Sequence, residues 1–260
     1  MRTWVGSMFR KGWSMRFVPS MRGVRCAHVV SASALIALLA IFGVAGDANA
    51  AERLGAWKEV KSEDGVLVAR RAVPGSSLDE FFGRGVVAAP LPEVLAVLMD
   101  TPHRPEWSDR CVASREVERL GEWSHVIYDR TKASWPAADR DAVIRVDTRF
   151  DAAAGVVVLD FRSVVDPRVP PVAGVVRVRS LGGRWVLRPV DDGRSTDVVY
   201  DVRADPGGDL PAWLANRVSK DLPFKTIVAI RKQVKRRSYP EFEAAVRQRP
   251  DYQAIMARAR

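Results

Sequence analysis

The strongest constraint on the fold of this chain is an alternation of apolar and polar side chains, clearest over residues 142–150. Successive side chains of a β-strand point to opposite faces, so this period of two predicts a strand with one buried and one solvated face. The same rhythm returns over 157–163, 176–180, 185–188 and 197–203. Short links favour pairing of neighbouring strands, and we therefore expect a meander of antiparallel strands with a single apolar face.

Turn residues divide these predicted strands. Glycine and proline clusters mark the ends of strands because they suit tight turns and cannot continue a regular ladder. The clusters are Gly155, the stretch 167–174, Gly182-Gly183 and the stretch 191–193. We therefore predict a hairpin turn at Gly182-Gly183.

The chain before these strands adds a hairpin and a short helix. Residues 57–71 predict a hairpin around Asp64-Gly65, a pair that tolerates the positive φ of a tight turn. Residues 81–87 predict a further strand. Residues 92–100 have apolar side chains at helical spacing and lie between prolines, which predicts a short helix with one buried face.

A long helix is predicted after the last strand, over residues 211–237. Trp213, Leu214, Val218 and Leu222 recur on one face, and Pro223 interrupts the segment without necessarily ending it. The opposite face is basic over 217–236. The fold class is therefore α+β: a curved antiparallel sheet whose apolar face is covered by a long C-terminal helix, with space between them for an apolar ligand.

The first fifty residues have the composition of a leader. Basic residues precede an uncharged stretch, residues 27–46, and a small-residue triplet follows at Ala48-Asn49-Ala50. These are the three parts of a secretory signal peptide, so we expect export to a periplasmic or extracellular compartment after cleavage behind Ala50. The alternative is a membrane anchor formed by 27–46, because about 20 uncharged residues suffice to span a bilayer.

Charge and cysteine content exclude several classes of function. The chain carries a net charge of +10, but six of its 41 basic and one of its 31 acidic residues lie in the leader, so the rest carries +5. That value is a weak signal for nucleic acid, and we expect no nucleic-acid partner. Cys111 would be the one cysteine after cleavage, and no metal-ligand or phosphate-loop spacing occurs, so neither a metal nor a cofactor is expected.

The candidate ligand-binding residues lie on the apolar side of the strands, at the proline-rich turns and on the long helix. Arg140 follows Asp139 and precedes Asp141. It is either part of a solvated turn or an inward anchor that requires a carboxylate partner, for which Asp139, Asp141 and Asp129 are the candidates. Inward hydroxyls are either satisfied in the core or free for a ligand. The full set is Trp107, Trp135, Arg140, Ile144, Val146, Thr148, Phe161, Ser163, Val178, Trp185, Tyr200, Trp213 and Val218.

Three stretches together resemble the START family, the steroidogenic acute regulatory protein-related lipid-transfer domains. They are the helix-to-loop segment from Pro92 to Ser108, the segment 135–141 (WPAADRD), and the segment 210–231 with its internal proline. The resemblance covers roughly 55–237. It implies a helix-grip fold, in which the C-terminal helix closes a hydrophobic tunnel, and the binding of one lipid, such as a sterol or phospholipid, without chemistry.

We therefore expect a lipid-binding domain over 51–237, followed by a basic helical tail over 238–260. The protein is expected not to be an enzyme, to be a monomer, and to contact anionic membrane surfaces through its basic C-terminal helix. One alternative is an enzyme of the same superfamily, such as a polyketide cyclase or aromatase, with Arg140, Tyr200 and the inward hydroxyls as its acid–base groups. Another is a scaffold domain with a filled core and no ligand.

Overall fold

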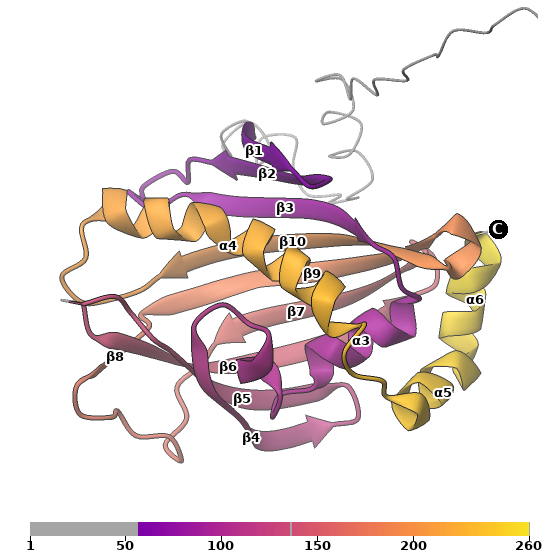
Figure 1. The fold of residues 1–260 in the computed structure, drawn as a ribbon. Helices are drawn as coiled ribbons and strands as arrows, with labels where there is room; N and C mark the ends of the chain where they lie inside the picture. The colour runs from indigo at the N-terminus through magenta and orange to yellow at the C-terminus, as the bar shows by residue number, and fades with distance from the viewer. Residues whose placement is uncertain (1–56, 136, 260) are drawn as a thin grey trace, which may run out of the picture. The chain divides into compact units, whose positions relative to one another are not determined.

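The computed structural model describes residues 57–135 and 137–259, and these residues form a ten-stranded sheet covered by helices (Figure 1). The strand order is β1-β2-β3-β10-β9-β7-β6-β5-β4, antiparallel throughout, and β8 pairs in parallel with β6. The strands are β1 (Lys58–Glu63), β2 (Val66–Arg71), β3 (Glu80–Val87), β4 (Cys111–Gly121), β5 (Ser124–Thr131), β6 (Asp139–Asp151), β7 (Val156–Ser163), β8 (Val175–Arg177), β9 (Ser180–Val190) and β10 (Ser195–Asp205).

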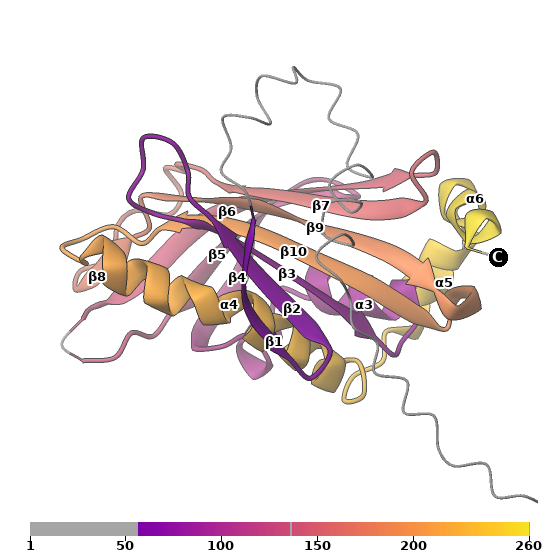
Figure 2. The same cartoon turned by 90° about the horizontal axis from the view of Figure 1, so that it is seen from above.

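Four α-helices and two short 3-10 turns complete the described part of the chain. The long helix α4 crosses one face of the sheet, which we call the inner face, over β2, β3 and β10 (Figures 1 and 2). This is the predicted helix-grip arrangement, with the sheet left open. The helical elements are α3 (Leu91–Met99), η1 (Arg104–Glu106), η2 (Asp191–Gly193), α4 (Ala212–Gln233), α5 (Pro240–Gln248) and α6 (Pro250–Arg258).

The alternation in β6 places its side chains as expected. Ile144 and Val146 lie on the inner face in the main core, whereas Val143 belongs to a separate cluster on the outer face. The same division holds in β7, where Leu159 is in the main core and Val158 in an outer cluster. The period of two therefore predicted which residues of these strands face the long helix.

Helix α4 approaches the sheet most closely at Gly83 of β3. A Cβ at Gly83 would lie 2.5 Å from Cβ of Pro223, so glycine is what allows the helix to pack this tightly. The helix continues through Pro223, which is itself buried. The expected buried face is wrong at two positions, because Trp213 and Val218 are each 66 % exposed. Early in the helix the buried face passes through Ala215 instead.

The predicted turn at Gly182-Gly183 is wrong. Both glycines lie inside β9 and pair with β10 at Arg203 and Val202. A Cβ at Gly183 would lie 2.0 Å from the backbone oxygen of Asp201, so this glycine marks a close approach of two strands. The strand expected over 176–180 is correspondingly shorter, since β8 ends at Arg177 and Ser180 begins β9.

The two edges of the sheet are irregular and charged. Edge strand β1 shows a register shift between Glu59 and Lys61, and edge strand β4 shows three such shifts. Exposed side chains of β4 include Arg115, Glu116 and Arg119. Bulges and charges of this kind disturb the ladder of backbone groups that an edge would otherwise present.

The C-terminal tail forms α5 and α6, which pack against α3 and the end of β6. Val246, Tyr252 and Ile255 are buried in the same core as the inner face of the sheet. The predicted leader, residues 1–50, lies outside the described residues. Within the described ranges, no helix is both long and apolar enough to cross a bilayer.

Candidate functional site

The inner face differs along its length in how completely it is filled. Central residues of β6, β9 and β10 keep 6–9 % exposure although they lie in the middle of the sheet: Ala142, Ile144, Val146, Trp185 and Tyr200. Residues further toward α3 have none: Val157, Leu187 and Val198. We call the first group, together with the side chains that share its face, the inner-face patch. It is mainly apolar.

Aromatic side chains make up much of the inner-face patch. The rings of Trp185 and Tyr200 stack at 3.8 Å between centroids with 5° between planes, and Phe161 lies 6.0 Å from Tyr200. Burial raises the pKa of the Tyr200 phenol above its ordinary value, so this hydroxyl is neutral and acts as a hydrogen-bonding group. Thr148 donates to Sδ of Met99 at 3.6 Å, and Ser163 accepts from the backbone N–H of Leu181 at 3.0 Å.

An ion pair on the same side of the sheet was missed by the sequence analysis. Asp129 of β5 pairs with Ala142 in register and therefore shares the inner face. Its carboxylate lies 3.7 Å from the Arg104 guanidinium and accepts a hydrogen bond from Ser114 at 2.5 Å. Nε of Arg104 is buried and has no hydrogen-bond partner within the described residues. The positive charge of Arg104 lowers the pKa of Tyr200, although burial raises that pKa by more. The Arg104 guanidinium therefore lies near the Tyr200 phenol.

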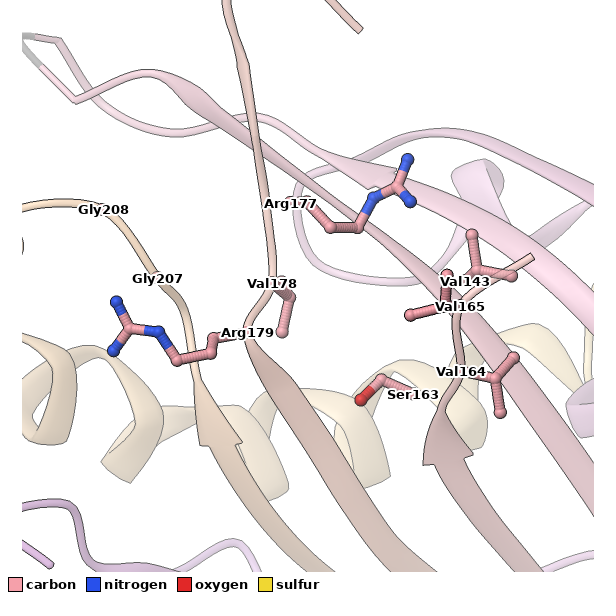
Figure 3. Close-up of a pocket in the computed structure, with 9 residues that line it drawn as sticks. All are labelled: Val143, Ser163, Val164, Val165, Arg177, Val178, Arg179, Gly207 and Gly208. Atoms are coloured by element: carbon pink, nitrogen blue, oxygen red, sulfur yellow. The ribbon is translucent and has the colours of Figure 1, made fainter. Parts of the chain in front are cut away.

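The structure contains a cavity of about 370 Å³ at the end of the sheet where α4 begins (Figure 3). Pairing between β7 and β9 stops at Arg162 and Gly182, and the backbone of Val178 bonds to Asp141 of β6 instead. The cavity occupies the resulting split in the sheet. Figure 3 shows Ser163, Val164 and Val165 on one side and Val178 and Arg179 on the other. Its other lining residues are Val143, Arg177, Gly207 and Gly208.

Arg140 lies beside this cavity but is not the ion-paired anchor that one reading of the sequence suggested. Its guanidinium donates to the backbone oxygens of Ala138 and Gly207, at 2.5 and 3.5 Å. The three candidate carboxylates have other partners: Asp139 pairs with Arg130, Asp141 with Arg177, and Asp129 with Arg104. Among the described residues, no carboxylate pairs with Arg140, whose guanidinium lies instead against the loop at Gly207 and Gly208.

The structure brings most of the predicted site residues together, and separates three of them. Ile144, Val146, Thr148, Phe161, Trp185 and Tyr200 belong to the inner-face patch, Ser163 and Val178 line the cavity, and Trp107 is half-buried against the same core. Trp135, Trp213 and Val218 are exposed at the surface instead, where the Trp135 side chain is 93 % exposed. Helical periodicity predicts a face but not what covers it, so Trp213 and Val218 could not be separated from the others by sequence. Trp135 was chosen from its proline-rich turn, which does not determine the direction of its side chain.

The described residues include no cluster for a metal ion and one buried free thiol. Within 57–135 and 137–259, no three His, Cys, Asp or Glu side chains cluster closely enough to hold a metal ion. Cys111 is a buried free thiol, and burial together with the nearby Asp129 raises its pKa to about 11. A thiol with so high a pKa is a poor nucleophile.

Comparison with known proteins gives consistent relatives. The START domain family model matches residues 48–237. An uncharacterized Pseudomonas aeruginosa protein, PA1579, is 33 % identical over 84 % of this chain and 100 % of its own length. The phosphatidylcholine transfer protein of Bos taurus is 30 % identical over 64 % of this chain and 78 % of its own. The crystal structure of a STAR-related lipid transfer protein from Xanthomonas axonopodis is 30 % identical, with a TM-score of 0.64, and covers 69 % of this chain and 98 % of that one.

Proposed function

Because this chain belongs to the START domain family, we propose that it binds one phospholipid between the inner-face patch and α4 and carries it between membranes without changing it chemically. The observation that carries the proposal is the inner-face patch beneath α4. Its side chains are aromatic and aliphatic, and the ion pair Arg104–Asp129 faces the same side. Apolar walls with few polar groups are typical of sites for apolar ligands.

The ion pair favours a phospholipid over a sterol. A guanidinium binds phosphate through several N–H groups, and Nε of Arg104 has no partner within the described residues. Asp129, on the other side of the pair, carries the negative charge that a headgroup cation requires. A zwitterionic headgroup such as phosphocholine complements both charges, whereas a sterol hydroxyl would leave both unused. The likeness to phosphatidylcholine transfer proteins supports the same ligand class.

Exchange with membranes is proposed to take place at the cavity end of the sheet. Trp135, Val165 and Trp213 come from three separate segments and are exposed there. Tryptophan prefers the interface between water and lipid. Basic residues adjoin them, including Lys132 and Arg217, and these attract anionic headgroups. A surface of this composition suits transient docking on a bilayer through the end at which α4 begins.

The experiment that tests this function is native mass spectrometry of the protein purified from a lipid-containing host, followed by extraction and lipid analysis. One phospholipid per chain is the expected result. The variant Arg104→Leu should retain less phospholipid than wild type, and the matched control Arg110→Leu, at an exposed position, should retain the wild-type amount. A ligand-free mass together with no uptake from vesicles of phosphatidylcholine and phosphatidylglycerol would overturn the proposal.

Export is part of the same proposal. The composition of residues 1–50 supports a cleaved leader, which would deliver the protein to a periplasmic or extracellular compartment. The intact mass of the purified protein tests this. A chain that starts at Ala51 supports cleavage, whereas a full-length chain that partitions with membranes supports the anchor of 27–46.

A further inference from the structure

The cavity of Figure 3 differs in position from the inner-face patch, because it lies in the plane of the sheet. Val178 packs against the main core on the inner face, whereas Val143 and Val164 pack together in a cluster on the outer face. Residues of both faces therefore line the cavity, at the split where β7 no longer pairs with β9. A phospholipid held between the inner-face patch and α4 would leave this split without a role.

Four valines supply the apolar part of the cavity wall. They are Val143, Val164, Val165 and Val178. The Val165 side chain is 98 % exposed at the rim, so apolar surface continues from the cavity to the outside. A wall of this kind suits a hydrocarbon chain that enters from solvent or from a membrane surface.

Two side chains of the same wall have hydrogen-bond donors to spare. The Ser163 hydroxyl accepts from the backbone N–H of Leu181 at 3.0 Å, and its own proton has no acceptor within the described residues. Figure 3 shows the Ser163 oxygen directed toward the side on which Val178 and Arg179 lie. One terminal nitrogen of Arg179 contacts Asp205 at 2.9 Å, while its Nε and its other terminal nitrogen donate to no group in the described part of the chain. Free guanidinium donors beside a hydroxyl suit an acidic group with two or more oxygens.

The charges around the cavity favour an acidic group rather than a basic one. Its nine lining residues include two arginines and no acid. The guanidinium of Arg177 is fully engaged by Asp141 and by backbone oxygens of the neighbouring loop. The guanidinium of Arg140, which has no carboxylate partner among the described residues, lies against Gly208 in the cavity wall. Asp209 follows in the same loop but does not line the cavity.

The volume of the cavity limits the number of chains that it accepts. A hydrocarbon chain is about 4 Å wide, because non-bonded carbon atoms approach to about 3.5–4.0 Å. The chains of one bilayer leaflet span about 15 Å, which is half of the hydrocarbon core. One such chain therefore occupies roughly 200–240 Å³, and two chains occupy roughly 400–480 Å³. A cavity of about 370 Å³ has room for one chain and not for two.

We propose that this cavity is a binding site for one single-chain amphiphile with an acidic head, the class to which fatty acids and acidic lysophospholipids belong. The chain lies against the four valines. The Ser163 hydroxyl and the Arg179 guanidinium hold the acidic head. This site is separate from the proposed phospholipid site and does not depend on it.

The test is isothermal titration calorimetry of the protein, as processed by the host, with octanoate, decanoate and dodecanoate. Each added methylene that becomes buried should tighten binding about fourfold until the chain fills the cavity. Dodecanol, which has the chain without the acidic head, should bind more weakly than dodecanoate. A lysophosphatidylglycerol with a dodecanoyl chain distinguishes the two sources of the head, since the tighter ligand identifies a carboxylate or a phosphate.

Two variants locate the binding. Val178→Phe places a ring in the cavity and should lose dodecanoate, while uptake of phosphatidylcholine from vesicles remains. Arg179→Gln should weaken dodecanoate binding about twofold to fivefold, because the side chain is 70 % exposed and its charge is screened. The matched control is Arg203→Gln, at an exposed position that does not line the cavity, and it should bind as wild type does.

Thermal unfolding of each variant establishes that it is folded, and the exposed Arg179→Gln change decides the matter if Val178→Phe does not fold. Wild-type affinity for dodecanoate in folded Val178→Phe, or in Arg179→Gln, would refute the site. Equal affinities for dodecanoate and dodecanol would refute the acidic head. A wild-type protein that binds dodecanoate but takes up no phosphatidylcholine would support this site while the proposed function fails.

Discussion

Replacement of Gly83 by alanine tests the contact that holds α4 against the sheet. The added Cβ would lie 2.5 Å from Cβ of Pro223, about 1 Å closer than the ~3.5 Å contact of two carbons. The neighbour is a ring atom close to the helix backbone, so α4 has to move away from β3. Overpacking of this kind costs about 1–3 kcal/mol. For a domain of this size each kcal/mol lowers the Tm by about 2–4 °C, so we expect a drop of roughly 2–12 °C.

The assay is thermal unfolding followed by circular dichroism, together with lipid uptake from vesicles. The control is Gly121→Ala, since a Cβ there meets nothing within 4 Å. This control should be neutral or slightly stabilising, because alanine restricts the unfolded chain more than glycine does. An unchanged Tm for Gly83→Ala would refute the reasoning, because the helix would then have room that the structure denies it. Loss of lipid uptake in a variant that is still folded would show that the proposed lipid site depends on the seating of α4.

Three further predictions concern separate parts of the molecule. Asp141→Asn should destabilise the fold by about 3 kcal/mol in urea unfolding. The substitution leaves Arg177 without the buried carboxylate that its guanidinium contacts at 2.7 Å. A change below about 0.5 kcal/mol would contradict this prediction. Burial, and secondarily Glu80, raises the pKa of Asp201 to about 8, so folding favours its protonated form. Wild type should therefore lose stability as the pH rises from about 4 through 8, and Asp201→Asn should remove that dependence in urea unfolding at a series of pH values. Trp135→Ala should leave stability within about 0.5 kcal/mol but weaken sedimentation with anionic vesicles; unchanged sedimentation would exclude this residue from the docking surface.

The sheet was largely predictable because its signal is local. In β6, the alternation of Ile144 and Val146 with Arg145 is set by the geometry of one strand and needs no knowledge of the partners. The same reasoning failed at Gly182-Gly183, because a glycine pair is used both for turns and for close approach of strands. Only the backbone oxygen of Asp201, which comes from a different strand, distinguishes the two cases.

The polar part of the candidate site was not predictable, because its members meet only in three dimensions. Arg104 lies in a proline-rich segment that reads as an ordinary loop, and Asp129 lies at the end of a strand. Arg140 has the stronger local pattern, between two aspartates, yet both of those carboxylates bind other arginines. Charge pairing depends on which strands are neighbours, and strand order is not contained in the periodicity of any one strand.

The irregular edges of the sheet bear on how such a protein survives as a carrier. In the proposed function, release of a lipid would require α4 to loosen from the inner face and expose apolar surface for a time. A flat edge strand beside that opening would offer a template on which a second chain could add, and repeated opening would lead to fibres. Register shifts in β1 and β4, with charged side chains along β4, remove that template. Under the proposed function, a chain that opens therefore presents no regular edge strand to which a second copy could add.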